Sequence, residues 1–203
     1  MSSTKSKLRL AAAFAALLTL ALAVSCKGFF VNQPTSVTVT PNAPTLTSGQ
    51  TISFAAQAAF SSSSKDVTKS ATWSSSNPCV VLIVASGTDA GNATDVGTGG
   101  TPTISASYNG IVGTTTVSAP TGLTISPCPE KDVSGSPAVV FKAGTNQQFA
   151  ASGTTLTVTW TATPSSTVSI TSGGLATFGP GSGPATINAS DGTTTGTLLI
   201  QVQ

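Results

Sequence analysis

The chain carries one series of short segments twice, in the same order. Within these segments apolar residues alternate with hydroxyl residues, which is the period of a β-strand with one buried face. The matching pairs are residues 37–41 with 123–127, 49–54 with 144–149, 72–74 with 159–161, and 103–107 with 186–190. The duplication predicts two copies of one all-β domain, at residues 34–119 and 121–203, which we call the first and the second repeat.

The composition also favours strands over helices. The chain has 35 Thr and 29 Ser, so 64 of its 203 residues carry a side-chain hydroxyl, and its only Glu is Glu130. A long-helix protein would be rich in Glu, Lys and Leu. Short strands between frequent Gly, Pro and Asn residues predict antiparallel β-sandwiches, one for each repeat.

The N-terminal segment has the features of an export signal. Lys5, Lys7 and Arg9 precede an apolar run over residues 10–24 that is interrupted by one Thr. An apolar run of about fifteen residues after a basic start is typical of a secretory signal. A transmembrane helix needs about 20 apolar residues. We expect residues 1–25 to be a signal peptide.

Residues 22–26, with the sequence Leu-Ala-Val-Ser-Cys, resemble a bacterial lipobox, in which a small residue stands before an obligatory Cys. The resemblance implies that Cys26 takes up a diacylglyceryl group and becomes the first mature residue, so that residues 26–33 form a lipidated tether. Lys27 follows the Cys, and by resemblance to sorting rules in some diderm bacteria the lack of Asp there favours the outer membrane. The alternative is an ordinary signal cleaved nearby, with Cys26 a free thiol.

Charge argues against binding to nucleic acid or to anionic lipid. Without residues 1–25 the chain has five Lys against six acidic residues, a net charge of −1. A nucleic-acid binder needs a clustered basic footprint, so no nucleic-acid partner is predicted. Each buried CH₂ of an acyl chain contributes about 0.8 kcal/mol, and two or three chains make a durable anchor.

The repeated motifs resemble the bacterial immunoglobulin-like group 2 family (BIG2). Its repeats open with an alternating strand that ends in Pro, followed by Gly-Gln before a strand with Phe, a Trp-Ser-Ser-Ser-Asn segment and a Thr-Ile-x-Ala strand. The matching residues are Pro41, Gly49, Gln50, Phe54, residues 73–77 and residues 103–106. The second repeat departs from this pattern, because the segment from Pro127 to Gly144 is longer. The resemblance implies an immunoglobulin-like sandwich for each repeat.

Two aromatic residues of each repeat occupy equivalent strand positions, Phe54 and Trp73 in the first and Phe149 and Trp160 in the second. We expect them in the core, where burying each side chain stabilises the domain by about 2–3 kcal/mol. The alternative for the Trp residues is stacking on sugar rings. A carbohydrate-binding module would need a row of surface aromatics, and the remaining candidates are Phe60, Tyr108, Phe141 and Phe178.

The residue types disfavour catalysis. The chain has no His, which excludes a Ser-His-Asp arrangement and His-based zinc sites. Two carboxylate pairs are close in sequence, Asp89 with Asp95 and Glu130 with Asp132, and we expect both in solvated loops where nothing raises their pKa. We predict a protein that is not an enzyme and needs no cofactor. Asp89, Asn92 and Asp95 could hold Ca²⁺, but a glycine-rich turn is the simpler interpretation.

Cys79 and Cys128 are free to pair in an exported protein. A disulfide closing a loop of about 50 residues would stabilise by roughly 4 kcal/mol. In an end-to-end stack of two sandwiches, however, a strand of about 20 Å separates the two residues, whereas bridged Cα atoms lie within about 7 Å. We therefore expect unpaired cysteines, unless the second repeat folds back alongside the first.

Together these features predict a non-catalytic surface lipoprotein that serves in display, adhesion or envelope structure. We expect its binding surface in the loop of residues 128–143, at the end of the second repeat furthest from the anchor. The alternative is a carbohydrate-binding protein associated with a surface enzyme complex. An open sheet edge could also accept a strand from a protein partner. The hydroxyl-rich residues 114–116 and 193–195 are interpreted as solvent-facing strand positions.

Overall fold

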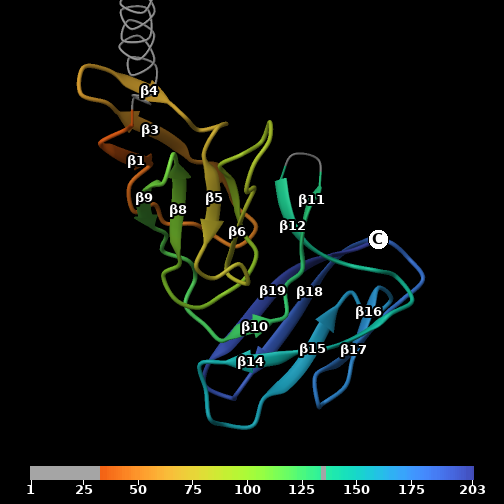
Figure 1. Ribbon diagram of the computed structural model, residues 1–203. Coiled ribbons are helices and arrows are strands. Elements are labelled where there is room, and N and C mark those ends of the chain that lie inside the picture. The colour runs from red at the N-terminus through yellow and green to blue at the C-terminus, as the bar shows by residue number, and fades with distance from the viewer. Residues whose placement is uncertain (1–32, 134–135) are drawn as a thin grey trace, which may run out of the picture. The chain divides into compact units, whose positions relative to one another are not determined.

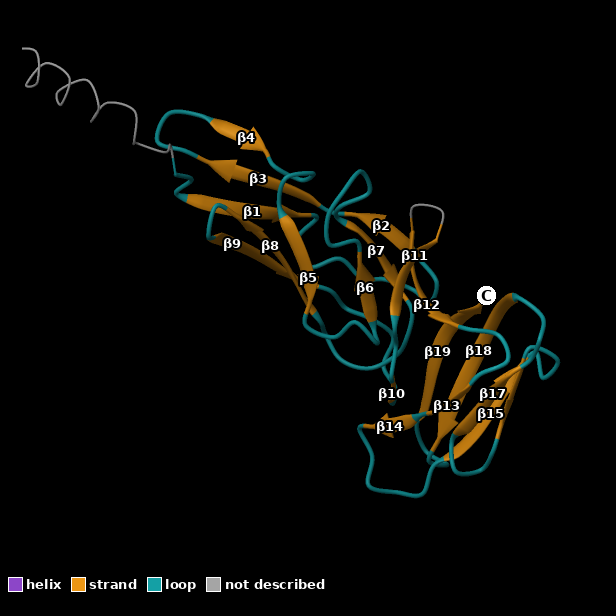
Figure 2. Ribbon diagram, turned by 45° about the vertical axis from the view of Figure 1, so that its right-hand side comes forward, coloured by secondary structure: helices purple, strands orange, loops and turns teal. Residues whose placement is uncertain are grey.

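A computed structural model describes residues 33–133 and 136–203 (Figure 1). The predicted signal peptide and Cys26 lie outside the described residues. Within the described part the chain forms strands and no helix (Figure 2). Residues 34–203 form one compact unit that holds two hydrophobic clusters. The predicted all-β class is confirmed, while the division at residues 119–121 stays a prediction.

The first repeat consists of three antiparallel three-stranded sheets. Their strand orders are β1-β3-β4, β2-β7-β6 and β5-β8-β9. The strands are β1 (Ser36–Thr40), β2 (Thr51–Ser53), β3 (Ala55–Ala59), β4 (Ser64–Asp66), β5 (Thr72–Ser75), β6 (Val81–Ile83), β7 (Asn92–Asp95), β8 (Thr103–Tyr108) and β9 (Ile111–Thr116).

The second repeat has sheets β10-β14, β13-β17-β16 and β11-β12-β19-β18-β15. All its strand pairs are antiparallel except β12 with β19. The strands are β10 (Thr124–Ser126), β11 (Glu130–Val133), β12 (Ser136–Phe141), β13 (Asn146–Gln148), β14 (Ala150–Ser152), β15 (Thr159–Thr163), β16 (Val168–Ile170), β17 (Leu175–Phe178), β18 (Gly183–Ser190) and β19 (Thr195–Val202).

The strand pairing of the first repeat recurs in the second. β1 pairs with β3 as β10 pairs with β14, and β2-β7-β6 corresponds to β13-β17-β16. The sheet β5-β8-β9 corresponds to β15-β18-β19, with Trp73 opposite Ala106 in one and Trp160 opposite Ala189 in the other. The matched sequence segments therefore occupy matched places in the two sets of sheets.

The second repeat differs by an added hairpin. The segment predicted as a loop, residues 128–143, contains β11 and β12, so Glu130 and Asp132 lie in a strand rather than in a solvated loop. The strand forms because Val139 and Phe141 alternate with less buried residues and bury their side chains in the second cluster. The end of β12 then pairs in parallel with the end of β19.

Each core is built around a Phe, a Trp and a Gly. Phe54 donates its N–H to the Gly91 carbonyl over 2.8 Å, and Phe149 donates to Gly174 over 2.9 Å. Both glycines have a positive φ, +90° and +82°, and a methyl group on either would overlap the Phe carbonyl oxygen and press tightly against the Trp ring. The Trp ring packs on the glycine, so these positions require Gly.

Three of the four predicted core aromatics are fully buried and the fourth is half-buried. Phe54, Trp73 and Phe149 are at most 2% exposed, whereas Trp160 is only partly buried against the second cluster. In the first repeat, the segment of residues 55–72 places Val67 and Ala71 in the same buried cluster as Trp73, and the Trp73 Nε1–H donates to the Thr68 carbonyl over 2.9 Å. The corresponding segment 150–159 is eight residues shorter, which leaves Trp160 less covered.

Candidate functional site

The β6–β7 part of the sheet β2-β7-β6 lies between the two hydrophobic clusters, whereas β2 is largely exposed. Val81, Ile83 and Ala93 belong to the first cluster, whereas Leu82 and Val96 belong to the second. All three residues of β6 are buried. The sequence signal for this burial is the run of five apolar residues at 80–84, which breaks the alternation of the other strands.

The hairpin strand β12 packs against β7 and β6 (Figure 2). A cavity of about 190 Å³ lies at this contact, lined by residues of both repeats that include Thr94, Pro137 and Leu199. The prediction that residues 128–143 lie at the end furthest from the first repeat is therefore wrong. This segment instead covers the outer face of the β6–β7 pair.

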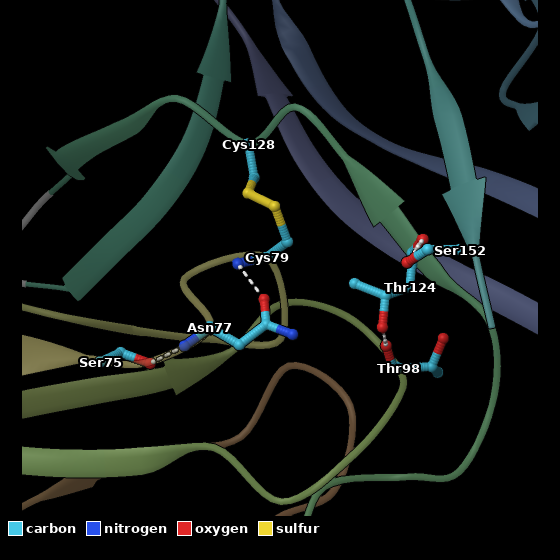
Figure 3. Close-up of a disulfide and its surroundings, with 7 residues drawn as sticks. All are labelled: Ser75, Asn77, Cys79, Thr98, Thr124, Cys128 and Ser152. Atoms are coloured by element: carbon cyan, nitrogen blue, oxygen red, sulfur yellow. Dashed lines mark hydrogen bonds between the residues drawn. A yellow bond between two sulfur atoms is a disulfide. The ribbon is translucent and has the colours of Figure 1, made fainter.

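Cys79 and Cys128 form a disulfide with a Cα–Cα distance of 5.3 Å (Figure 3). The expectation of unpaired cysteines about one strand length apart is wrong, because the second repeat contacts the first through β12 rather than only end to end. The Asn77 side chain accepts the Cys79 N–H over 3.2 Å. Gly97 lies so close that a methyl group on it would overlap the Cys79 carbonyl oxygen.

Thr98 connects the repeats next to the disulfide. Its hydroxyl donates to the Leu123 carbonyl over 2.6 Å and accepts the Thr197 N–H over 2.9 Å. Its own N–H donates to the Thr197 carbonyl over 3.1 Å, and its carbonyl accepts the Thr124 hydroxyl over 3.1 Å (Figure 3). Leu199 donates to the Val96 carbonyl over 2.7 Å. Val96 and Thr98 of the first repeat are thus hydrogen-bonded to the backbone of β19.

Asp95 lies in β7 rather than in a solvated loop. Its side chain is fully buried, and among the described residues neither carboxylate oxygen has a hydrogen-bond partner. Burial raises the pKa of Asp95 to about 6. The nearby N–H of Gly97, which donates to the Val80 carbonyl, offsets only part of this rise. The carboxyl group is a buried titratable site that the sequence did not predict.

The three candidate calcium ligands do not come together. Asn92 lies in β7 and accepts the Ser53 hydroxyl over 2.7 Å. Because Asn92 and Asp95 are three residues apart in one strand, their side chains point to opposite faces. Asp89 precedes the strand, and its carbonyl accepts the Asn92 N–H. In the part of the chain that the structure describes, no three His, Cys, Asp or Glu side chains could hold one metal ion.

The candidate sugar-stacking aromatics are covered. Phe141 and Phe178 are buried, with ring centroids 4.7 Å apart in a stacked arrangement. Phe60 and Tyr108 are partly buried against the first cluster. Within residues 33–133 and 136–203, the large apolar side chains that are exposed are Val112, Leu156 and Leu175, none of them aromatic. A row of surface aromatics is therefore not formed by these residues.

The matched pairing of the repeats points to one family of domains. Residues 34–117 match the family model of the bacterial Ig-like domain of group 2. Over these residues the chain is similar to the group 2 bacterial Ig-like domains. The resemblance inferred from the repeated motifs is confirmed, and the match covers nearly all of the first repeat. Such a domain is a non-catalytic kind of module and indicates a protein of the bacterial surface or envelope, in a surface or adhesion role.

Several solved structures match this chain at low sequence identity, and this chain spans about a quarter of the length of the first surface-layer structure. Surface-layer protein SbsC, domains 1–6, is 17% identical with a TM-score of 0.33, and the match covers 84% of this chain and 28% of that one. A C-terminal fragment of intimin, in complex with the intimin-binding domain of its translocated receptor, is 18% identical with a TM-score of 0.31, covering 83% and 63%. Human protocadherin-24 EC1-2 is 11% identical with a TM-score of 0.26, covering 84% and 98%.

A search of curated protein sequences found no match to the chain. Among the residues of known position, no helix is long and apolar enough to cross a membrane. The lipidation of Cys26 stays a prediction.

Proposed function

We propose that the protein is a non-catalytic lipoprotein, held on the bacterial envelope by acyl chains on Cys26, whose group 2 Ig-like repeats act as a display or adhesion module. The observation that carries the proposal is the group 2 domain at residues 34–117, directly after the predicted lipobox and tether. Lys27 next to the acylated residue supports the outer membrane as its site.

The disulfide supports an exported location. Disulfides persist in oxidising compartments and are rare in the cytosol. Cys79 and Cys128 join the two repeats through this bond. The bond thus agrees with a chain that leaves the cytoplasm with residues 1–25 as its signal.

The contacts between the repeats support a mechanical role. Besides the disulfide, four hydrogen bonds of Thr98 and the buried Leu82 and Val96 join the repeats. A stiff pair of domains presents a ligand-binding surface at a fixed distance from its anchor. A flexible pair would lose free energy on ordering when it binds.

The partners in this proposal are the membrane, through the lipid, and an extracellular protein or glycan ligand. The experiment compares the full chain with its Cys26→Ser variant in a diderm bacterial host. The unaltered chain is expected in the outer-membrane fraction, and Cys26→Ser in a fraction without membranes. Equal membrane association of both would overturn the lipid anchor. Protection of the unaltered chain from protease added to whole cells would overturn display at the surface.

A further inference from the structure

The outer edge of β15 is open, although the equivalent edge in the first repeat is not. The backbone N–H of Trp73 points away from β8 and donates to the Ala85 carbonyl over 2.9 Å. Trp160 lies opposite Ala189 in the same register as Trp73 opposite Ala106. The backbone N–H and carbonyl of Trp160 therefore also point away from β18. Among the described residues nothing pairs with these groups, and β15 is the last strand of its sheet.

Two shortened loops explain why this edge is open. Residues 85–91 in the first repeat correspond to residues 172–174 in the second, which removes the segment that contains Ala85. Residues 55–72, which include β4 and the cover over Trp73, correspond to the shorter 150–159. The shortening leaves Leu156 56% exposed, and Leu175, next to Gly174 under the Trp160 ring, 40% exposed.

The exposed edge also lacks the usual protection against pairing. Natural edge strands carry charges, Pro or bulges that block another strand. The edge strand β4 carries Lys65 and Asp66, whereas β15 has the sequence Thr-Trp-Thr-Ala-Thr without charge or Pro. In the second repeat the side chains of known position that carry charge are Lys142 and Asp191, and neither belongs to β15.

We propose that β15 is a self-docking edge, which pairs antiparallel with β15 of a second copy of this chain around a two-fold axis at Thr161. In this register Trp160 of each copy lies opposite Ala162 of the other. Both residues have outward backbone groups, so the two copies form four N–H to carbonyl bonds. The large indole meets a small methyl group, and the two Thr161 residues face each other as a non-hydrogen-bonded pair.

Few other registers are possible, because the bonds between copies must come from the outward backbone groups of Trp160 and Ala162. A shift by two residues toward the N-terminus places Trp160 opposite Trp160. A shift by two toward the C-terminus places Trp160 opposite Pro164, which has no N–H to donate. The register centred on Thr161 uses all the outward groups of Trp160 and Ala162. It joins two five-stranded sheets into one continuous sheet without placing like charges opposite each other.

Disulfide trapping in the full chain tests this pairing. In a non-hydrogen-bonded antiparallel pair the Cα atoms lie about 4.5 Å apart, within the range for a disulfide. The Thr161→Cys variant is therefore expected to form a covalent dimer under mild oxidation. The matched control is Ser74→Cys, at the equivalent solvent-facing position of β5, and the unaltered chain gives the background from Cys26. Absence of a dimer with Thr161→Cys, or equal dimer with Ser74→Cys, would overturn the proposal.

Two further variants test the geometry. Adding Ala162→Pro to Thr161→Cys removes two of the four bonds between copies but no bond to β18, so the dimer yield should fall about tenfold. The unfolding midpoint of this variant distinguishes lost pairing from lost folding. Thr161 of one copy lies opposite Thr161 of the other in the proposed register. Thr161→Lys and Thr161→Glu chains should therefore each sediment as monomers, because like charges meet, and should associate when mixed. A mixture that remains monomeric overturns the register.

Discussion

The Cα atoms of Cys79 and Cys128 lie 5.3 Å apart and their sulfur atoms are bonded, although the residues belong to different repeats. The bond fastens the turn before β6 to the segment after β10, where Thr98 also joins the repeats. The covalent link and the hydrogen bonds therefore constrain the same contact.

Removing the disulfide should destabilise the protein strongly. Cys79 and Cys128 are 49 residues apart in sequence, and closing a loop of this length contributes about 4 kcal/mol to the free energy of unfolding. Cys79→Ser should lower the urea midpoint accordingly, and Cys79→Ser with Cys128→Ser should lower it no further than either change alone. Cys26→Ser is the control and should leave the midpoint unchanged. A double variant as stable as the unaltered chain would contradict the contribution of the bond.

The buried Asp95 carboxyl should make stability decrease as pH rises from about 4 to 6. Burial raises its folded pKa to about 6 from an unfolded value of 3.8, so the folded state binds the proton more tightly in this window. Deprotonation then costs roughly 2–3 kcal/mol at neutral pH. Asp95→Asn should raise the free energy of unfolding at pH 7 and flatten its dependence on pH, as measured by urea unfolding at several pH values.

Asp66 provides the control with the opposite sign. Hydrogen bonds from Thr68 lower the pKa of Asp66, so its contribution to stability is present above the unfolded pKa and is lost as pH falls. Asp66→Asn should therefore leave the decrease in stability between pH 4 and 6 in place. If Asp95→Asn also leaves this decrease in place, Asp95 is not its source.

The Thr98 hydroxyl should contribute more to the free energy of unfolding than an exposed hydroxyl does. Thr98→Val leaves the Leu123 carbonyl and the Thr197 N–H without their side-chain partner in a buried setting, which costs about 2–4 kcal/mol. The control is Thr51→Val, which breaks an exposed hydrogen bond to Thr94 and should cost under about 1 kcal/mol. Chemical denaturation of both variants measures the difference. Equal losses would mean that Thr98 does not fasten the repeats.

Gly91 should tolerate no side chain. Gly91→Ala adds a methyl group that overlaps the Phe54 carbonyl oxygen at a positive φ, so it should destabilise by about 3 kcal/mol or more. Gly87→Ala is the matched control, because Gly87 also has a positive φ but no atom within 4 Å of the added methyl. It should cost only about 1–2 kcal/mol of backbone strain. Thermal unfolding distinguishes the two, and similar losses would refute the steric argument.

The sequence was sufficient to predict the class and the internal duplication, because strand alternation and the Phe and Trp positions are local patterns that recur. It was not sufficient to predict the disulfide. The pairing of Cys79 with Cys128 depends on how the hairpin β11–β12 packs on β6 and β7, and that packing is a contact distant in sequence. The run of apolar residues 80–84 did carry a signal for a strand covered on both faces.

The burial of Asp95 and of Trp160 differs from the sequence-based prediction, for two different reasons. Asp95 looked solvated because it follows a Gly-Asn-Ala-Thr segment, yet the alternation of β7 places it on the same face as the buried Ala93. Trp160 looked equivalent to Trp73, and its strand position is equivalent. Its exposure differs because the covering segments are shorter, an effect of loop length that a strand motif does not contain.

Intact mass of the full chain extracted from membranes, alkylated with and without prior reduction, tests the central claim most directly. The account predicts a chain that begins at an acylated Cys26 and gains no alkyl groups at Cys79 and Cys128 until it is reduced. A chain with an unacylated start, or one whose Cys79 and Cys128 alkylate without reduction, would contradict an anchored module with covalently joined repeats.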